Sequence, residues 1–142
     1  MRYTISKKKR KNELRIYFAK SSKFPELGKK ERVDIHDNVD GFAALTWNTA
    51  SKVIEKAAVF IATEKSSGTF QRHIILEELT QTLGLMGDNS VYPESVTYSR
   101  GRDQGKAGTL GAMDIKALKL IYLHLKAGDG ALQTGIQFSR YW

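Results

Sequence analysis

The chain contains 142 residues, of which 41% are hydrophobic and 27% are charged, values typical of a single globular domain. It contains no cysteine, which excludes disulfide bonds and thiolate metal sites. Apolar runs such as Ala57–Ala62 are far too short to cross a bilayer as a helix. The sequence therefore predicts one folded core and no transmembrane segment.

Basic residues are concentrated at the N-terminus. The formal net charge is +8, and residues 1–11 contain six basic side chains and no acidic one. The remaining 131 residues carry 17 basic and 15 acidic side chains, a net charge of only +2. A nucleic-acid-binding domain usually spreads its basic charge over a folded face, so this distribution argues against nucleic acid as a partner. We expect a basic N-terminal tail over residues 1–11 and a single domain over residues 12–142.

The basic run has two interpretations. The simpler one is a solvated chain end, and the sharper one is a patch that binds phosphate or an anionic lipid surface. A secretory signal would need an apolar segment after the basic residues, and residues 12–15 supply none. We therefore expect either an intracellular protein or the mature or trimmed form of an exported one.

Three segments have the composition of β-strands. Residues 14–18 alternate between apolar and polar side chains, residues 42–47 are mostly apolar, and residues 56–63 contain the unbroken apolar run of a buried strand. The stretch over residues 26–40 is polar and charged, so we expect mainly loop there, with a short strand at residues 33–35.

A helix is predicted over about residues 70–86, with Thr69 as its N-cap. One face of this helix is apolar, and the opposite face mixes two carboxylates with apolar side chains. We expect both faces to be covered and the acids to line a cleft. The first face consists of Ile75, Leu76, Leu79, Leu83 and Met86, and the second of Glu77, Glu78, Gln81, Phe70, Ile74 and Leu85.

The remainder of the chain begins with a glycine-rich segment. Residues 87–111 contain five of the twelve glycines and are predicted to be loop. A second helix is predicted over about residues 112–126. Residues 136–142 are expected to add an edge strand or to cover the core.

The predicted first helix contains a motif, Glu77-Glu78-Leu79-Thr80-Gln81-Thr82-Leu83-Gly84. It resembles the active-site helix of metzincin metalloproteases, whose pattern is H-E-x-x-H-x-x-G-x-x-H. In this overlay Glu77 and Gln81 occupy the first two histidine positions, and Glu78 occupies the position of the catalytic glutamate. Gly87 falls at the third ligand position, with Asp88 one residue later.

Two further segments agree with the metzincin order and spacing. Ser95-Val96-Thr97-Tyr98 resembles the Met-turn that lies beneath the metal, with Thr97 in place of methionine. Residues 110–115 resemble the start of the closing helix. The overlay makes Tyr98 a candidate hydrogen-bond donor to a transition state.

A closer resemblance is to a largely uncharacterised bacterial family of exported or lipoprotein domains with zincin-like features. Its signature runs E-E-L-T-Q-x-L-G-L, then an aspartate, then Y-P-x-S, and then a helix that ends in L-Y. The chain matches it at residues 77–85, at Asp88, at residues 92–95 and at residues 120–122, where an isoleucine is interposed. This resemblance covers roughly residues 42–127 and implies an exported or periplasmic location.

The motif allows a metal-dependent chemistry. Glu77, Gln81 and Asp88 would be metal or water contacts, and Glu78 would act as general base on a bound water. Because the ligands are oxygen atoms and Gln81 is a weak one, the set favours Mg²⁺, Ca²⁺ or Mn²⁺ over tightly bound zinc.

A structural role for these residues is the alternative. Glu77 and Gln81 stand four residues apart and can bond to each other, and Glu78 can pair with Arg100 or Arg102. His73 lies one turn before Glu77, where the pair forms either a two-ligand clamp or, as we expect, a surface ion pair. His36 and His124 have no ligand spacing to another histidine.

The sequence thus predicts an α+β, zincin-like domain, with a small mixed sheet packed against the active-site-like helix and a C-terminal helix. Its resemblance implies a pseudo-protease, or a protein that binds a peptide or a cell-wall component. The alternatives are an active metal-dependent hydrolase with Glu78 as general base, and binding to anionic surfaces through the basic tail.

Overall fold

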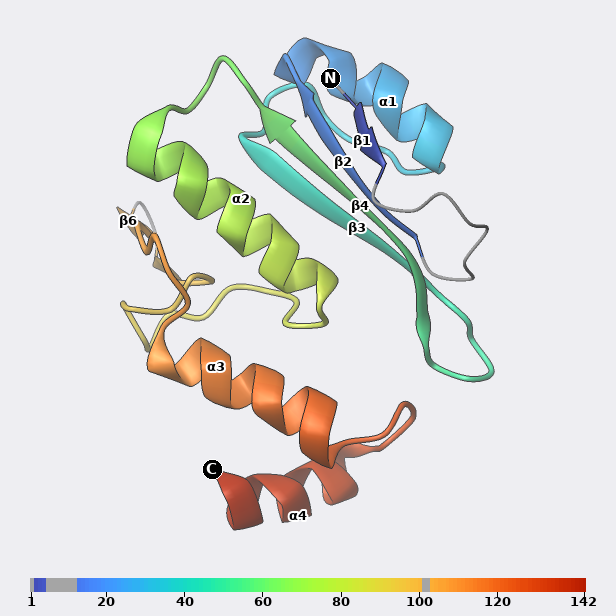
Figure 1. The fold of residues 1–142 in the computed structure, drawn as a ribbon, viewed down its shortest axis with the longest axis vertical. Coiled ribbons are helices and arrows are strands. Elements are labelled where there is room, and N and C mark those ends of the chain that lie inside the picture. The colour runs from blue at the N-terminus through green and yellow to red at the C-terminus, as the bar shows by residue number, and fades with distance from the viewer. Residues whose placement is uncertain (1, 5–12, 101–102) are drawn as a thin grey trace.

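A computed structural model of the protein describes residues 2–4, 13–100 and 103–142, and it has the predicted α+β class with a mixed sheet (Figure 1). The main strands and helices, in chain order, are β1 Arg2–Thr4, β2 Glu13–Ala19, α1 Phe24–Glu31, β3 Gly41–Trp47, β4 Ile54–Ala62, α2 Gly68–Thr82, α3 Ala112–Lys119 and α4 Ala131–Tyr141. A 3-10 turn at Ser21–Lys23 precedes α1, two short strands, β5 Ser99–Arg100 and β6 Asp103–Gln104, form a hairpin, and a π-helical turn at Leu120–His124 extends α3.

The sheet has the strand order β1-β2-β4-β3. Strand β4 pairs in parallel with β2 and antiparallel with β3, whereas β1 pairs antiparallel with β2. Strand β4 is therefore central, which explains its continuous run of buried residues from Ala58 to Ala62. Strand β3 lies at an edge of this sheet.

Both faces of β4 are covered. Phe60 packs on one face against Phe24 of α1, and Val59 and Ile61 pack on the other face against Ile74 of α2. Because side chains alternate along a strand, the single run in β4 supplies both core clusters. Each fully buried large apolar side chain in them contributes about 1.5–3 kcal/mol relative to exposure.

The predicted strands over residues 14–18, 42–47 and 56–63 are confirmed as β2, β3 and β4. The helix predicted over residues 112–126 is confirmed as α3 with its π-helical extension. The prediction of mainly loop over residues 26–40 was wrong for residues 26–31, because Pro25 initiates α1 and Arg32 ends it in the left-handed conformation. Residues 33–35 form no strand.

Helix α2 differs from its prediction at both ends. Ser67, not Thr69, is the N-cap, and the helix ends at Thr82. Leu83 and Met86, which were assigned to the apolar face, lie beyond this end and are exposed. Ile75 and Leu79 of the predicted apolar face pack against the core cluster of the sheet, and so do Phe70 and Ile74 from the other face. Glu78 also reaches the sheet, at Gly41 of β3. The physical reason is the glycine at position 41, which leaves room for a carboxyl group between helix and strand.

The C-terminal segment forms neither an edge strand nor a cover for the core, so that prediction was wrong. It forms the helix α4, none of whose residues is buried. The helix joins the rest of the chain at its C-terminal end, where Tyr141 stacks on His124 and Lys116 lies over the ring of Trp142.

The structure describes residues 2–4 of the predicted basic tail. Residues 2–4 form β1 and pair with β2, and residues 5–12 lie outside the described residues. Binding to an anionic surface through this run stays a prediction. Among the helices in the described part of the chain, none is long and apolar enough to span a membrane.

Candidate functional site

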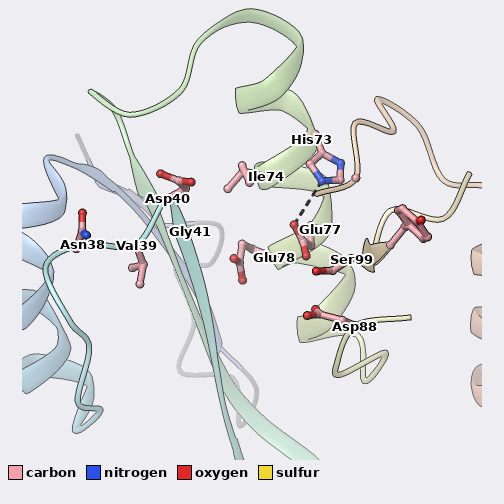
Figure 2. Close-up of a pocket in the computed structure, with 12 residues that line it drawn as sticks. Asn38, Val39, Asp40, Gly41, His73, Ile74, Glu77, Glu78, Asp88 and Ser99 are labelled. Atoms are coloured by element: carbon pink, nitrogen blue, oxygen red, sulfur yellow. Dashed lines mark ion pairs between the residues drawn. The ribbon is translucent and has the colours of Figure 1, made fainter. Parts of the chain in front are cut away.

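A cleft of about 320 Å³ lies between α2, the start of β3 and the loops that follow α2 (Figure 2). Four carboxylates and one histidine line it together with small polar and apolar groups. The lining residues are Asn38, Val39, Asp40, Gly41, His73, Ile74, Glu77, Glu78, Asp88, Tyr98, Ser99 and Gly105.

Glu78 occupies the sheet side of the cleft. Its side chain extends from α2 towards β3 and is pressed against Gly41, so closely that a Cβ atom at position 41 would lie 2.6 Å from its Oε1 atom (Figure 2). The residue is only 7% exposed, and no described residue donates a hydrogen bond to its carboxylate. Burial, with a smaller contribution from the charges of Glu77 and Asp88, raises the pKa of Glu78 to about 8.

Glu77 and His73 form a pair on the loop side of the cleft. The distance from His73 Nε2 to Glu77 Oε2 is 3.5 Å. Burial and then the charge of Asp88 raise the pKa of Glu77 to about 7. The expectation of a surface ion pair was wrong in its location, because His73 is only 2% exposed and the pair faces the cleft.

Two contacts fix the ring of His73. Its Nδ1 atom lies 3.0 Å from the carbonyl oxygen of Ala107, and its Cε1 atom would lie 2.9 Å from a Cβ atom at Gly105. A carbonyl oxygen can only accept a hydrogen bond, so Nδ1 carries the hydrogen. In the neutral ring Nε2 is therefore an acceptor, and it points towards Glu77.

The segment from Ser95 to Tyr98 is buried, and its last residue, Tyr98, lines the cleft. Asp114, in the first turn of α3, holds it. The Asp114 carboxylate accepts hydrogen bonds from Ser95 Oγ at 2.5 Å, from the amide of Val96 at 2.9 Å and from the amide of Gly111 at 2.8 Å. These bonds connect the segment to the start of α3 and bring Tyr98 to the cleft.

Four of the five site residues predicted from the sequence line this cleft, namely Glu77, Glu78, Asp88 and Tyr98. Gln81, the remaining one, is not among the lining residues. In the described ranges, no group of three or more histidine, aspartate or glutamate residues is close enough to hold a metal ion. Metal binding by the predicted set of Glu77, Gln81 and Asp88 stays a prediction.

Sequence reasoning missed two contributors to the site and misplaced a third. The spacing of four residues correctly paired His73 with Glu77, but the pair was expected on the surface. Asp40 and Gly41 reach the cleft only because β3 pairs with β4, and no local pattern marks them. The alternative partner Arg100 makes no ion pair with Glu78, and Arg102 lies outside the described residues.

Comparisons with known proteins identify a family but no characterised relative. Neither a curated protein nor a solved structure matches the chain. A family model described as a protein of unknown function, DUF2927, matches residues 2–137, nearly the whole chain. The chain therefore belongs to the DUF2927 family.

Proposed function

We propose that this protein is a divergent zincin-like domain that binds an extended peptide of protein or cell-wall origin along β3, a pseudo-protease in which the cleft has become a docking site. The observation that carries the proposal is that β3 is an edge strand whose first residue, Gly41, also lines the acidic cleft. A peptide added to this edge would therefore pass directly over the cleft.

The hydrogen-bond pattern of β3 supports the addition of a further strand. Asp40 accepts a bond from the amide of Ala62, which places residue 40 in a hydrogen-bonded pair of the antiparallel ladder. Because such pairs alternate with non-bonded pairs, the backbone N–H and C=O groups of Ala43 and Leu45 point away from β4. An extended peptide can bond to these groups, as in other cases of strand addition.

An exposed aromatic ring extends the binding surface. Trp47, at the far end of β3 from the cleft, is 55% exposed. Large aromatic rings contribute strongly to binding because they bury much apolar surface with little loss of rotational freedom. Peptide contacts would thus run from the cleft at Gly41 to Trp47.

The zincin-like part of the proposal is supported by the arrangement of the resembling segments. The helix with the Glu-Glu-x-x-Gln motif lies beside an edge strand, and the buried turn Ser95–Tyr98 follows and is bound to the start of α3. The replacement of the histidine ligands by Glu77 and Gln81 favours binding over metal-dependent catalysis.

A matched set of peptides tests this function. Fluorescence anisotropy would measure the binding of labelled decapeptides of extended, β-prone sequence, each paired with a copy N-methylated at alternate residues. Strand addition predicts that the unmethylated peptides bind. It also predicts that N-methylation of every second residue abolishes binding when the methylated amides are those that would donate hydrogen bonds to β3. Equal binding of both copies would contradict it.

A protein variant provides the second arm. Leu45→Pro removes an outward N–H group without removing a β3–β4 hydrogen bond, a position where an edge strand tolerates proline. We expect lost peptide binding with a native circular dichroism spectrum. The N-methylated peptides keep the test valid if the variant does not fold.

A second candidate function is peptide hydrolysis with Glu78 as general base. It is favoured by the pKa values of about 7 and 8 for Glu77 and Glu78, because groups that exchange protons near neutral pH suit acid–base catalysis. Tyr98 lines the same cleft and would donate a hydrogen bond to the developing oxyanion.

Mass spectrometry of bound peptides, incubated with wild type, Glu78→Gln and Tyr98→Phe, tests this candidate. Hydrolysis predicts cleavage that disappears in Glu78→Gln and slows by about 10–100-fold in Tyr98→Phe. Intact peptides with wild type, or cleavage that survives Glu78→Gln, would exclude it.

A further inference from the structure

The cleft is acidic although the chain as a whole is basic. The formal net charge of the protein is +8, yet the cleft is lined by Asp40, Glu77, Glu78 and Asp88. None of its described lining residues is a lysine or an arginine. The negative charge is thus a local property of this site, and no lysine or arginine among the described lining residues balances it.

Glu78 adds an observation that is independent of the acidic cluster. Its side chain is more than nine-tenths buried, lines the cleft and receives no hydrogen bond from a described residue. Its charged neighbours Glu77 and Asp88 are acids as well. A buried carboxyl group without a donor is costly, and a donor that enters from outside would relieve this cost.

The histidine in the cleft is held in place and pairs with Glu77. The Nδ1 atom of His73 donates to the carbonyl of Ala107, and Nε2 lies 3.5 Å from Oε2 of Glu77. The carboxylates of Glu78, Asp40 and Asp88 are acceptors, and they favour a ligand that carries several N–H donors and a positive charge.

We propose that the cleft binds a cationic group of the ligand, the ammonium of a lysine side chain or the guanidinium of an arginine side chain in the peptide on β3. This inference rests on the proposed function, and it states which side chains of the peptide the cleft would prefer. The side chains of an added strand alternate between the two faces of the sheet. Those on the α2 face would enter the cleft next to Glu78.

The acidic cleft suits an inorganic cation less well than it suits a lysine or arginine side chain. In the described chain no three histidine, aspartate or glutamate side chains are close enough to share a metal ion. The ammonium group of a lysine or the guanidinium group of an arginine does not need three ligands around one point. Its N–H donors can bond to several separate acceptors in a cleft of about 320 Å³.

Four peptides that differ at one central residue test the proposal by fluorescence anisotropy: lysine, Nε-acetyl-lysine, norleucine and glutamate. We expect the lysine peptide to bind wild type at least about tenfold more tightly than the acetyl-lysine peptide, which has the same stem without the charge. In Glu78→Gln this preference should fall to within about twofold. Asp129→Asn, an exposed carboxylate outside the cleft, should retain the wild-type preference.

The outcomes separate this inference from the proposed function. Peptides that bind without charge preference would overturn the cation site and leave strand addition intact. If no peptide binds, Nα-acetyl-lysine methylamide is titrated alone with two-dimensional NMR. Shifts at residues 73–78 would then support the cation site and exclude docking on β3, and no shifts would overturn both. Displacement of the lysine peptide by micromolar Mn²⁺ or Zn²⁺ would reassign the site to a metal.

Discussion

Gly41 is the residue on which the geometry of the cleft depends most directly. A Cβ atom at this position would lie 2.5 Å from Cγ2 of Ile74 and 2.6 Å from Oε1 of Glu78, distances at which the side chains of α2 or the helix itself must shift. Gly41→Ala should therefore destabilise the protein by about 1–3 kcal/mol, because it forces α2 away from β3.

Urea denaturation followed by circular dichroism measures this effect. Gly108→Ala is the matched control, since a Cβ atom at Gly108 meets nothing within 4 Å, and it should change stability by about 0.5 kcal/mol or less. Equal effects of the two substitutions would show that the contact between Gly41 and α2 does not constrain the fold.

Glu78 makes stability depend on pH. Its pKa is raised from 4.5 to about 8 in the folded protein, so the native state holds the proton more tightly than the unfolded chain. The contribution is complete below pH 4.5 and is lost as the pH rises through about 8. The free energy of unfolding should fall across this range by an amount on the order of a few kcal/mol.

Urea midpoints for wild type and Glu78→Gln between pH 5 and 8.5 check this expectation. The wild-type midpoint should decrease with pH, and the variant should show a smaller decrease, the part that remains coming from Glu77. Parallel curves for the two proteins would mean that Glu78 ionises normally.

At the scale of single residues, four residues that the sequence singled out lie around one cleft. Glu77 and Glu78 are adjacent on a helix, and the resemblance added Asp88 and Tyr98, all of which line the cleft. Gln81 is not among the residues that line the cleft. The position of Glu78 depends on the space left by Gly41, which no pattern within the helix can reveal.

Asp114 connects two elements and should be the most sensitive carboxylate outside the cleft. It is buried and accepts hydrogen bonds from Ser95, Val96 and Gly111. Asp114→Ala leaves buried donors without a partner, so thermal and urea unfolding should show a loss of about 2–4 kcal/mol.

Asp129→Ala is the matched control for this prediction. Asp129 is exposed and accepts one hydrogen bond, from the amide of Lys126, and its loss should cost about 1 kcal/mol or less. A loss for Asp114→Ala no larger than this control would contradict the role of Asp114 in holding the Ser95–Tyr98 segment.

Helix α4 should be the least protected of the long helices. None of its residues is buried, and Leu132 is 81% exposed. Hydrogen exchange measured by mass spectrometry should give exchange in α4 about tenfold or more faster than in α2, which packs against the sheet. Similar protection of the two helices would indicate that α4 packs against a surface absent from the isolated chain.

The predictions for elements succeeded where one pattern dominated. The apolar run of β4 and the alternation in β2 were recognised because the burial of each strand determines which of its positions are apolar. Helix α1 was missed because polar residues outnumber apolar ones, so that Phe24 and Leu27 alone reach the core. Helix α4 was missed because Gly135 lies in its interior, where glycine disfavours helix.

At the scale of the whole molecule, the sequence predicted the α+β class but not the order of the strands. The edge position of β3 follows from parallel pairing of β2 with β4 across more than thirty intervening residues, and such non-local pairing leaves no local pattern. The alignment of the edge strand with the acidic cleft is therefore a result of the structure alone.

The most direct test of the proposed function is amide hydrogen exchange in β3, resolved by residue with NMR, with and without a saturating β-prone lysine peptide. Strand addition predicts that the outward amides of Ala43 and Leu45 gain protection, whereas those of Phe42 and Ala44, already bonded to β4, change little. Saturating peptide that leaves Ala43 and Leu45 unprotected would contradict docking along β3.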